Sequence, residues 1–205
     1  MTAPVVAVVD YGIGNLRSAA KALERGGADA RPARNPRVID AADGVVLPGV
    51  GAFGSCARAL EASGLGPATL AAATGTRPFL GICVGMQLLY ESSEESPGVP
   101  GLGVLGGRVR RLGGGLKVPH MQWNRVDVVG DGPLARALAG PPPWMYFVHS
   151  YAVPPGPEVV AVSDYGGPVV AAVSRGALWA TQFHPEKSGR AGLALLGRFA
   201  AACAG

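Results

Sequence analysis

The sequence predicts an α/β fold with a mainly parallel central sheet and an antiparallel excursion. Two observations indicate it. Short apolar runs alternate with helical patterns through the first half, and strand-like runs dominate the second half. The chain has 205 residues, of which 48% are hydrophobic and 16% charged. We therefore expect one domain, covering residues 1–205, with a full core.

The first half reads as strand–helix units. Residues 5–9 form a fully apolar run, and residues 15–25 follow with apolar positions at helical spacing. The further expected elements of this half are, in chain order, a strand at 45–47, helices at 55–63 and 67–73, a strand at 78–82 and a helix beginning at 86–90.

After Tyr90 the pattern changes. The acidic residues 91–95 read as a loop, and the glycine-punctuated segments that follow predict the antiparallel excursion. The expected strands run through Val104, Val109, Val118, 126–129, 146–148, 159–162, 169–173 and 178–183. A last helix is expected from Ser188, a typical N-cap residue, with Leu193, Leu196 and Phe199 on one face.

Composition excludes several classes of protein. No apolar run is long enough to cross a bilayer, and residues 5–9 are too short for a signal-peptide core. The sequence Gly12-Ile13-Gly14 lacks the third glycine of a dinucleotide fingerprint, and the three cysteines have no metal-like or disulfide-like spacing. We expect a cytoplasmic protein with no cofactor, no metal and no membrane partner.

The net charge is +4, and its basic residues are scattered. The densest group surrounds a glycine turn at 113–115 and consists of Arg108, Arg110, Arg111 and Lys117. No aromatic platform accompanies it, so we expect a solvated hairpin and no nucleic-acid partner. An anionic small molecule and an acidic partner surface remain alternative ligands of this basic group.

The strongest chemical signal is Gly81-Ile82-Cys83-Val84-Gly85. It lies between a strand-like run and a helical one, as in a nucleophile elbow whose strained turn requires small neighbours. A following helix N-terminus favours the reactive thiolate. A buried cysteine is more often a plain core residue, and Gly-x-Cys-x-Gly arises readily in a chain with 32 glycines.

A second signal, His184-Pro185-Glu186, favours a nucleophilic role for Cys83 over a plain core role, because it also follows an apolar run. The carboxyl ends of parallel strands share one edge of a sheet, and Pro185 keeps His184 out of the helical region. We therefore expect Cys83, His184 and Glu186 to meet as nucleophile, base and orienting carboxylate for acyl transfer.

Acyl transfer also needs hydrogen-bond donors for the developing oxyanion. Two backbone sources are candidates: the amide of Val84 and the glycine-rich turn Gly49-Val50-Gly51. An ordinary strand-to-helix turn explains the second segment equally well.

Six segments together resemble the class I glutamine amidotransferases. Those around 48–53, 81–89 and 184–188 resemble the family in general. Those at 10–18, 117–124 and 147–151 resemble the branch that supplies ammonia to a separate cyclase in histidine biosynthesis. The resemblance implies a three-layer sandwich and a glutaminase with the triad Cys83, His184 and Glu186. It places Val50 and Val84 at the oxyanion hole. It assigns glutamine binding to Gly49, Gly51, Gln87, Glu95, His149, Ser150 and Tyr151.

The resemblance also implies a partner, a (β/α)₈ cyclase that receives the ammonia and forms imidazole glycerol phosphate and aminoimidazole carboxamide ribotide. Positions matching that interface are Asn15, Trp123, Tyr146 and Lys187. Two residues depart from the family pattern. Gln122 stands where glycine is usual, and Val84 where leucine is commoner.

Two alternatives remain open. The chain could serve another synthase of the family, for pyridoxal phosphate, anthranilate or guanylate, since all share the triad. A different class is a non-catalytic regulatory subunit, but such a protein has no need of all three triad residues.

Overall fold

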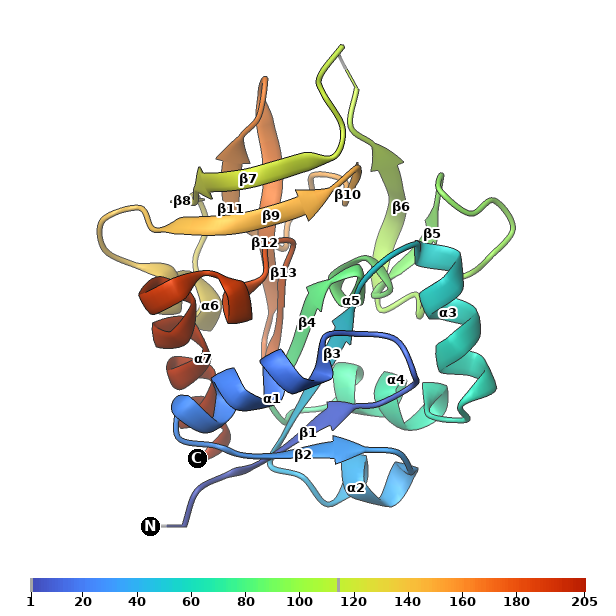
Figure 1. Cartoon of the computed structure of the whole chain (residues 1–205), viewed down its shortest axis with the longest axis vertical. Helices are drawn as coiled ribbons and strands as arrows, with labels where there is room; N and C mark the ends of the chain where they lie inside the picture. Colours follow the sequence, from blue (N-terminus) through green and yellow to red (C-terminus); the bar gives the residue numbers. More distant parts are fainter. Residues whose placement is uncertain (1, 114) are drawn as a thin grey trace.

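The computed structural model describes residues 2–113 and 115–205. Within them the central feature is an eight-stranded sheet in the order β2-β1-β3-β4-β13-β12-β11-β8 (Figure 1). Its parallel part consists of β2 (Asp29–Ala33), β1 (Val5–Val9), β3 (Gly44–Gly49), β4 (Phe79–Cys83) and β13 (Leu178–Thr181). The antiparallel part consists of β12 (Pro168–Arg175), β11 (Val159–Asp164) and β8 (Asp127–Val128). The predicted mainly parallel sheet is confirmed.

Helices cover both faces of the sheet. As a consequence, β3, β4 and β13 are buried along their whole length. One layer contains α1 (Leu16–Arg25), α6 (Pro133–Leu138) and α7 (Gly189–Cys203), which pack against one another through α7. The other contains α2 (Pro36–Asp40), α3 (Phe53–Ala62) and α4 (Gly66–Thr74), with α2 packed on α4. None of these helices, in the part of the chain described, is both long and apolar enough to cross a membrane.

Two small sheets stand beside the main one and correspond to the expected excursion. The first has the order β10-β6-β5, with β5 (Tyr90–Ser93), β6 (Leu105–Arg111) and β10 (Tyr151–Ala152). The second is an antiparallel ribbon of β7 (His120–Arg125) and β9 (Trp144–His149). Figure 1 shows this ribbon beside the start of α7, where the short 3₁₀ helix η1 (Pro185–Lys187) also contacts β9.

The helix expected from Met86 to Tyr90 is a single turn, α5 (Val84–Gln87), and Tyr90 already begins β5. The cause is a competing set of hydrogen bonds. The amides of Leu102 and Leu105 donate to the carbonyls of Leu88 and Leu89, at 2.7 and 2.8 Å. A distant segment thus takes the carbonyls that a longer helix would have used.

Two loop predictions were also wrong. Residues 91–93 are not a loop, because β5 pairs in parallel with β6. The hairpin expected around 113–115 does not form, since β6 pairs with β10 and β5 instead of with the segment that follows it. The glycine turn itself includes residue 114, which lies outside the described residues. Arg108, Arg110 and Arg111 are exposed, as expected for a solvated group.

Some elements were missed or misplaced. β2, α2 and α6 were not predicted, although Asn35 caps α2 through its side chain and Pro36 opens the helix, a recognisable start signal. Val118 lies in no strand, and of 126–129 only Asp127–Val128 pairs. Ser188 does precede α7, but its hydroxyl makes no capping bond to that helix.

Candidate active site

The candidate site lies where three neighbouring parallel strands end. Gly49 at the end of β3 is paired with Cys83 at the end of β4, and Thr181 of β13 is paired with Ile82. The prediction that Cys83 and His184 lie at one edge of one sheet is confirmed. In such sheets, the carboxyl edge of the strands is where ligands bind.

Cys83 has the strained backbone expected of an elbow. Its φ of 55° and ψ of −112° make it the one non-glycine residue at positive φ in the described parts of the chain. The turn is tight enough that a Cβ on Gly85 would collide with the Leu47 carbonyl oxygen. The strain is therefore held by close packing of α5 against β3.

His184 and Glu186 form a buried pair. Nδ1 of His184 lies 2.8 Å from Oε1 of Glu186, and both side chains are almost fully buried. The other ring nitrogen, Nε2, makes no hydrogen bond to any other described residue. Burial on its own lowers the pKa of His184, but the Cys83 and Glu186 side chains outweigh burial and raise that pKa to about 9.

The ribbon strand β9 holds the His184 loop in place. The His184 amide donates to the Tyr146 carbonyl at 2.9 Å. The Ser188 hydroxyl accepts from the Tyr146 amide at 3.0 Å and donates to the His184 carbonyl at 2.6 Å. Ser188 therefore joins the loop to β9, which explains why its hydroxyl does not cap α7.

A cavity of about 310 Å³ opens in front of Cys83 and His184. Most residues expected to bind glutamine or the oxyanion line it, namely Val50, Gly51, Val84, Gln87, Glu95, His149, Ser150 and Tyr151. Gly49 is not among the lining residues; it borders a neighbouring, much smaller cavity with Asn15 and Glu186.

Gln182 lies at the site, although the sequence predicts it only as part of a strand. It is fully buried, and its Nε2 lies 3.7 Å from Sγ of Cys83. Its Oε1 accepts from Nε2 of Gln87 at 3.0 Å, and the same nitrogen of Gln87 donates to the Tyr151 carbonyl. A buried amide at the end of an otherwise apolar run was the available signal.

Glu95 lies at the rim of the cavity and is fixed by α3. Its Oε2 accepts from the Phe53 amide at 2.6 Å, at a helix start where the N-cap residue Ala52 offers no side-chain acceptor. A carboxylate is favourable at this position. The hydrogen bond from the Phe53 amide therefore occupies Oε2 of Glu95 and fixes the orientation of Oε1.

His149 belongs to a chain of neutral groups. Its Nδ1 lies 2.9 Å from the Tyr151 carbonyl, which can only accept, so this nitrogen carries the hydrogen. Its Nε2 then accepts from Nδ1 of His120 at 3.1 Å. His120 is stacked between the rings of Phe147 and Tyr165. Burial lowers the pKa of both His120 and His149 to about 4.

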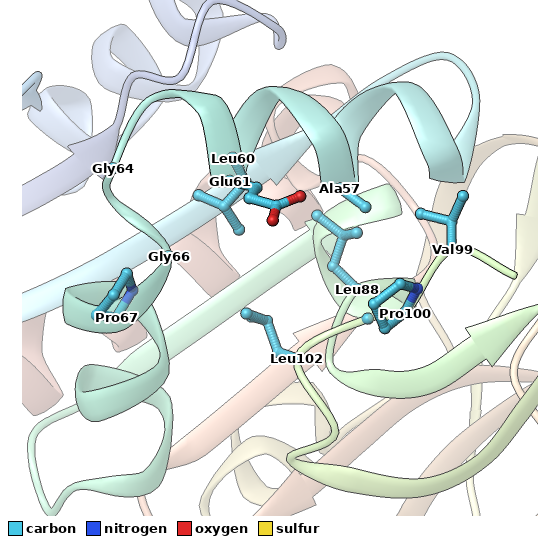
Figure 2. Close-up of a pocket in the computed structure, with 11 residues that line it drawn as sticks. Ala57, Leu60, Glu61, Gly64, Gly66, Pro67, Leu88, Val99, Pro100 and Leu102 are labelled. Atoms are coloured by element: carbon cyan, nitrogen blue, oxygen red, sulfur yellow. The ribbon is translucent and has the colours of Figure 1, made fainter.

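A second cavity, of about 400 Å³, lies between α3, the start of α4 and the loop 99–102 (Figure 2). Figure 2 shows Leu60, Leu88, Val99 and Leu102 around it. Glu61 is the one ionisable residue that lines it, and no cysteine, serine or histidine accompanies that carboxylate. The smaller cavity at Cys83 is therefore the candidate active site.

Two of the residues expected at a partner interface lie next to the site, since Lys187 lines its cavity and Asn15 borders the small cavity at His184 and Glu186. On the outer face of the ribbon, Trp123 is 47% exposed and contacts Tyr146, with ring centroids 6.1 Å apart. Lys187 is exposed, with Nζ 6.0 Å from the Tyr146 ring centre. Two further apolar residues of the ribbon, Met121 and Trp144, are also exposed.

Comparison with known proteins identifies the class. Residues 7–202 match the family described as glutamine amidotransferase class-I, and the chain belongs to that family. Solved structures with the same fold include one titled glutamine amidotransferase, with a TM-score of 0.76 at 22% identity over 98% of this chain and 99% of that one. Another is PurLQS from Thermotoga maritima, with a TM-score of 0.73 at 20% identity, covering 96% and 97% of the two chains.

Curated relatives are more specific. A protein of Deinococcus radiodurans is 52% identical over 201 residues, covering 96% of this chain and 93% of its own. One of Methanothermobacter thermautotrophicus is 50% identical over 196 residues, covering 95% and 97%. Both are named imidazole glycerol phosphate synthase subunit HisH.

The histidine pair predicts a loss of stability in acid. Unfolded histidines have a pKa near 6.5, whereas His120 and His149 titrate near 4 when folded. Between these values the unfolded state binds more protons, so the free energy of unfolding falls as pH drops. Urea unfolding from about pH 7 to about pH 4.5 should show this decline.

The variants His149→Gln and His184→Gln show which histidines cause the loss of stability in acid. His149→Gln should flatten the decline. His184→Gln should keep it, because the raised pKa of His184 contributes stability below pH 6.5 that is lost only as pH rises through 9. An unchanged slope in His149→Gln would contradict the assignment.

Proposed function

We propose that this chain is the glutaminase subunit of an imidazole glycerol phosphate synthase, acting in histidine biosynthesis. The observation that carries the proposal is the placement of Cys83 in a strained elbow, beside the buried His184–Glu186 pair, at one sheet edge. The names of relatives at 50 to 52% identity support the choice of synthase.

In the proposed reaction, the Cys83 thiolate attacks the side-chain amide carbon of glutamine. His184, held protonated by its raised pKa, gives a proton to the leaving nitrogen, and ammonia departs from the tetrahedral intermediate. Water then hydrolyses the thioester with His184 as base and releases glutamate. Glu186 orients the ring through Nδ1 and stabilises its positive charge.

The oxyanion is assigned to two backbone amides. Val84 follows the nucleophile directly, and Val50 lies in the loop after β3 that borders the same cavity. For Val84, only the amide acts, so valine in place of the commoner leucine is acceptable. Gly49 has no room for a side chain, since a Cβ would lie 2.7 Å from the Gly85 amide nitrogen. Glycine at this position therefore lets the end of β3 pack directly against the turn after Cys83.

Glutamine binding is assigned to the residues that line the cavity. The free carboxylate oxygen of Glu95 suits the ammonium group of the substrate, and the backbone around Gly51 and His149 suits its carboxylate. The side chains of Gln87, Ser150 and Tyr151 complete the cavity wall. Gln87 has only its oxygen available, because its nitrogen already donates twice.

The partner in this proposal is a (β/α)₈ cyclase that uses the ammonia to form imidazole glycerol phosphate and aminoimidazole carboxamide ribotide. The name of the relatives describes a subunit, which implies a second chain. The outer face of the β7–β9 ribbon suits this partner, because exposed aromatic side chains such as Trp123 and Trp144 are typical of interface centres. Asn15, Tyr146 and Lys187 extend the proposed contact.

Two further parts of the proposal concern the whole chain. Residues 1–205 act as one glutamine amidotransferase domain, which the family match over 7–202 supports. The protein works in the cytoplasm, where its three free cysteines stay reduced.

Replacing the nucleophile should separate the two half-reactions. Cys83→Ala and Cys83→Ser should abolish glutamine hydrolysis, while the complex with the cyclase still uses added ammonia. The measurements are glutamate release and product formation with each nitrogen source. Cys203→Ala is the control, since Cys203 is also buried but lies in α7. Substantial hydrolysis by Cys83→Ala would refute the assignment.

The two other triad residues should differ in importance. His184→Ala removes the proton shuttle and should lower kcat by about two to four orders of magnitude. Glu186→Gln should cost less, because an amide oxygen still accepts from Nδ1 but does not stabilise a charged ring. Steady-state kinetics of the complex compare them. Near-normal turnover in His184→Ala would require another base.

The subunit should be nearly inactive alone and be activated by the cyclase with its ribotide ligand. Ammonia is mostly protonated in neutral water, so uncoupled hydrolysis wastes glutamine. The Gly49–Val50 peptide is the proposed switch, with the partner acting through Asn15 and Trp123. Glutaminase rates should rise from the free chain to the complex and again with ligand.

Trp123→Ala should reduce the activation and weaken the complex. Its control is Trp179→Phe, a change at a buried tryptophan of β13 away from the ribbon. Equal rates in all three states of the wild type would eliminate the switch.

A further inference from the structure

Two buried side chains bond to the loop that follows β3. The Tyr11 hydroxyl donates to the Pro48 carbonyl at 2.7 Å. The Cys56 thiol donates to the Val50 carbonyl, with Sγ and oxygen 3.2 Å apart. The two donors come from different elements, since Tyr11 precedes α1 and Cys56 lies in α3. The loop is therefore held at both ends from two directions.

The peptide between these two carbonyls is the one assigned to the oxyanion hole. Among the described residues, no side chain bonds to the Gly49 carbonyl or to the Val50 amide. The Pro48–Gly49 and Val50–Gly51 peptides are thus tied down by side chains, and the Gly49–Val50 peptide is not. Rotation of that single peptide leaves both tethers intact.

Both donors are well placed to keep their hydrogens. Tyr11 is 5% exposed and Cys56 is fully buried. Burial raises the pKa of the Tyr11 hydroxyl and of the Cys56 thiol, so each remains a donor at neutral pH. Neither residue lines the cavity in front of Cys83. They therefore affect the loop without contacting substrate.

We propose that Tyr11 and Cys56 are positioning residues which clamp the two peptides flanking Gly49–Val50, so that this peptide alone turns its amide toward the oxyanion. The proposal rests on the proposed function, because it assigns the clamp to the glutaminase step. It explains why a buried cysteine other than the nucleophile has a hydrogen-bond partner at the active-site loop, whereas Cys203 is buried among core residues.

The test uses Tyr11→Phe, Cys56→Ala and the conservative variant Cys56→Ser in the complex with the cyclase. Loss of either hydrogen bond should lower the kcat for glutamine about five- to tenfold, with KM changed less than about twofold. Cys56→Ser retains a donor and should recover most of the rate. Tyr90→Phe and Cys203→Ala, also buried, are controls and should keep wild-type kcat.

Alkylation of Cys83 by iodoacetamide separates the clamp from general damage. This reaction forms a carbon–sulfur bond, expels iodide and builds no oxyanion. Its rate at Cys83, followed by peptide mass, should therefore stay the same in the clamp variants. A parallel fall in alkylation and glutaminase rates would overturn the proposal, as would an unchanged kcat or an effect confined to KM.

Hydrogen exchange in the free chain gives a readout that does not depend on catalysis. Amides of residues 49–52 should exchange faster in Tyr11→Phe and Cys56→Ala, while β1 and β12 keep their protection. If the wild-type complex had no glutaminase activity, the proposed function would fail. An unchanged exchange rate in the loop would then separately overturn the clamp.

Discussion

The close packing of the turn after β4 on the end of β3 is the constraint on which the site depends. Gly85 touches the Leu47 carbonyl, and this contact leaves no space for any side chain. It holds Cys83 at positive φ, at the edge where β3 and β13 also end. The loop after β3, Cys83 and His184 therefore converge because three parallel strands are neighbours.

Opposite environments set the charge of the three histidines. His184 is buried, but it lies between two groups that favour its protonated form, and its pKa rises to about 9. His120 and His149 are buried against each other and against aromatic rings, and within the described residues no carboxylate bonds to either ring, so their pKa falls to about 4. One histidine thus holds a proton at neutral pH while two serve as neutral hydrogen-bonding groups.

The β7–β9 ribbon connects the surface with the site. The outer face exposes Trp123, and the inner face carries the His120–His149 pair that ends at the cavity wall. The backbone of Tyr146 at the same time fixes His184 and Ser188. If the partner binds the outer face as proposed, it acts on a strand that is hydrogen-bonded to the backbone of His184, the proposed base, and this gives a short physical path for coupling.

The sequence by itself determined the features that depend on local pattern. The apolar runs predicted β1, β3, β4 and β13, and the spacing of glycines around Cys83 predicted its strained elbow. Only the tertiary structure decided features that depend on distant partners. α5 ends after one turn because residues 102 and 105 bond to the carbonyls of the two residues that follow Gln87 in the chain, namely Leu88 and Leu89. β5 forms because β6 lies beside it, and Gln182 meets Cys83 across adjacent strands. A hydrogen bond between residues far apart in the chain produces no periodic pattern in the sequence. These contacts are therefore defined only by the order of the strands in the sheet.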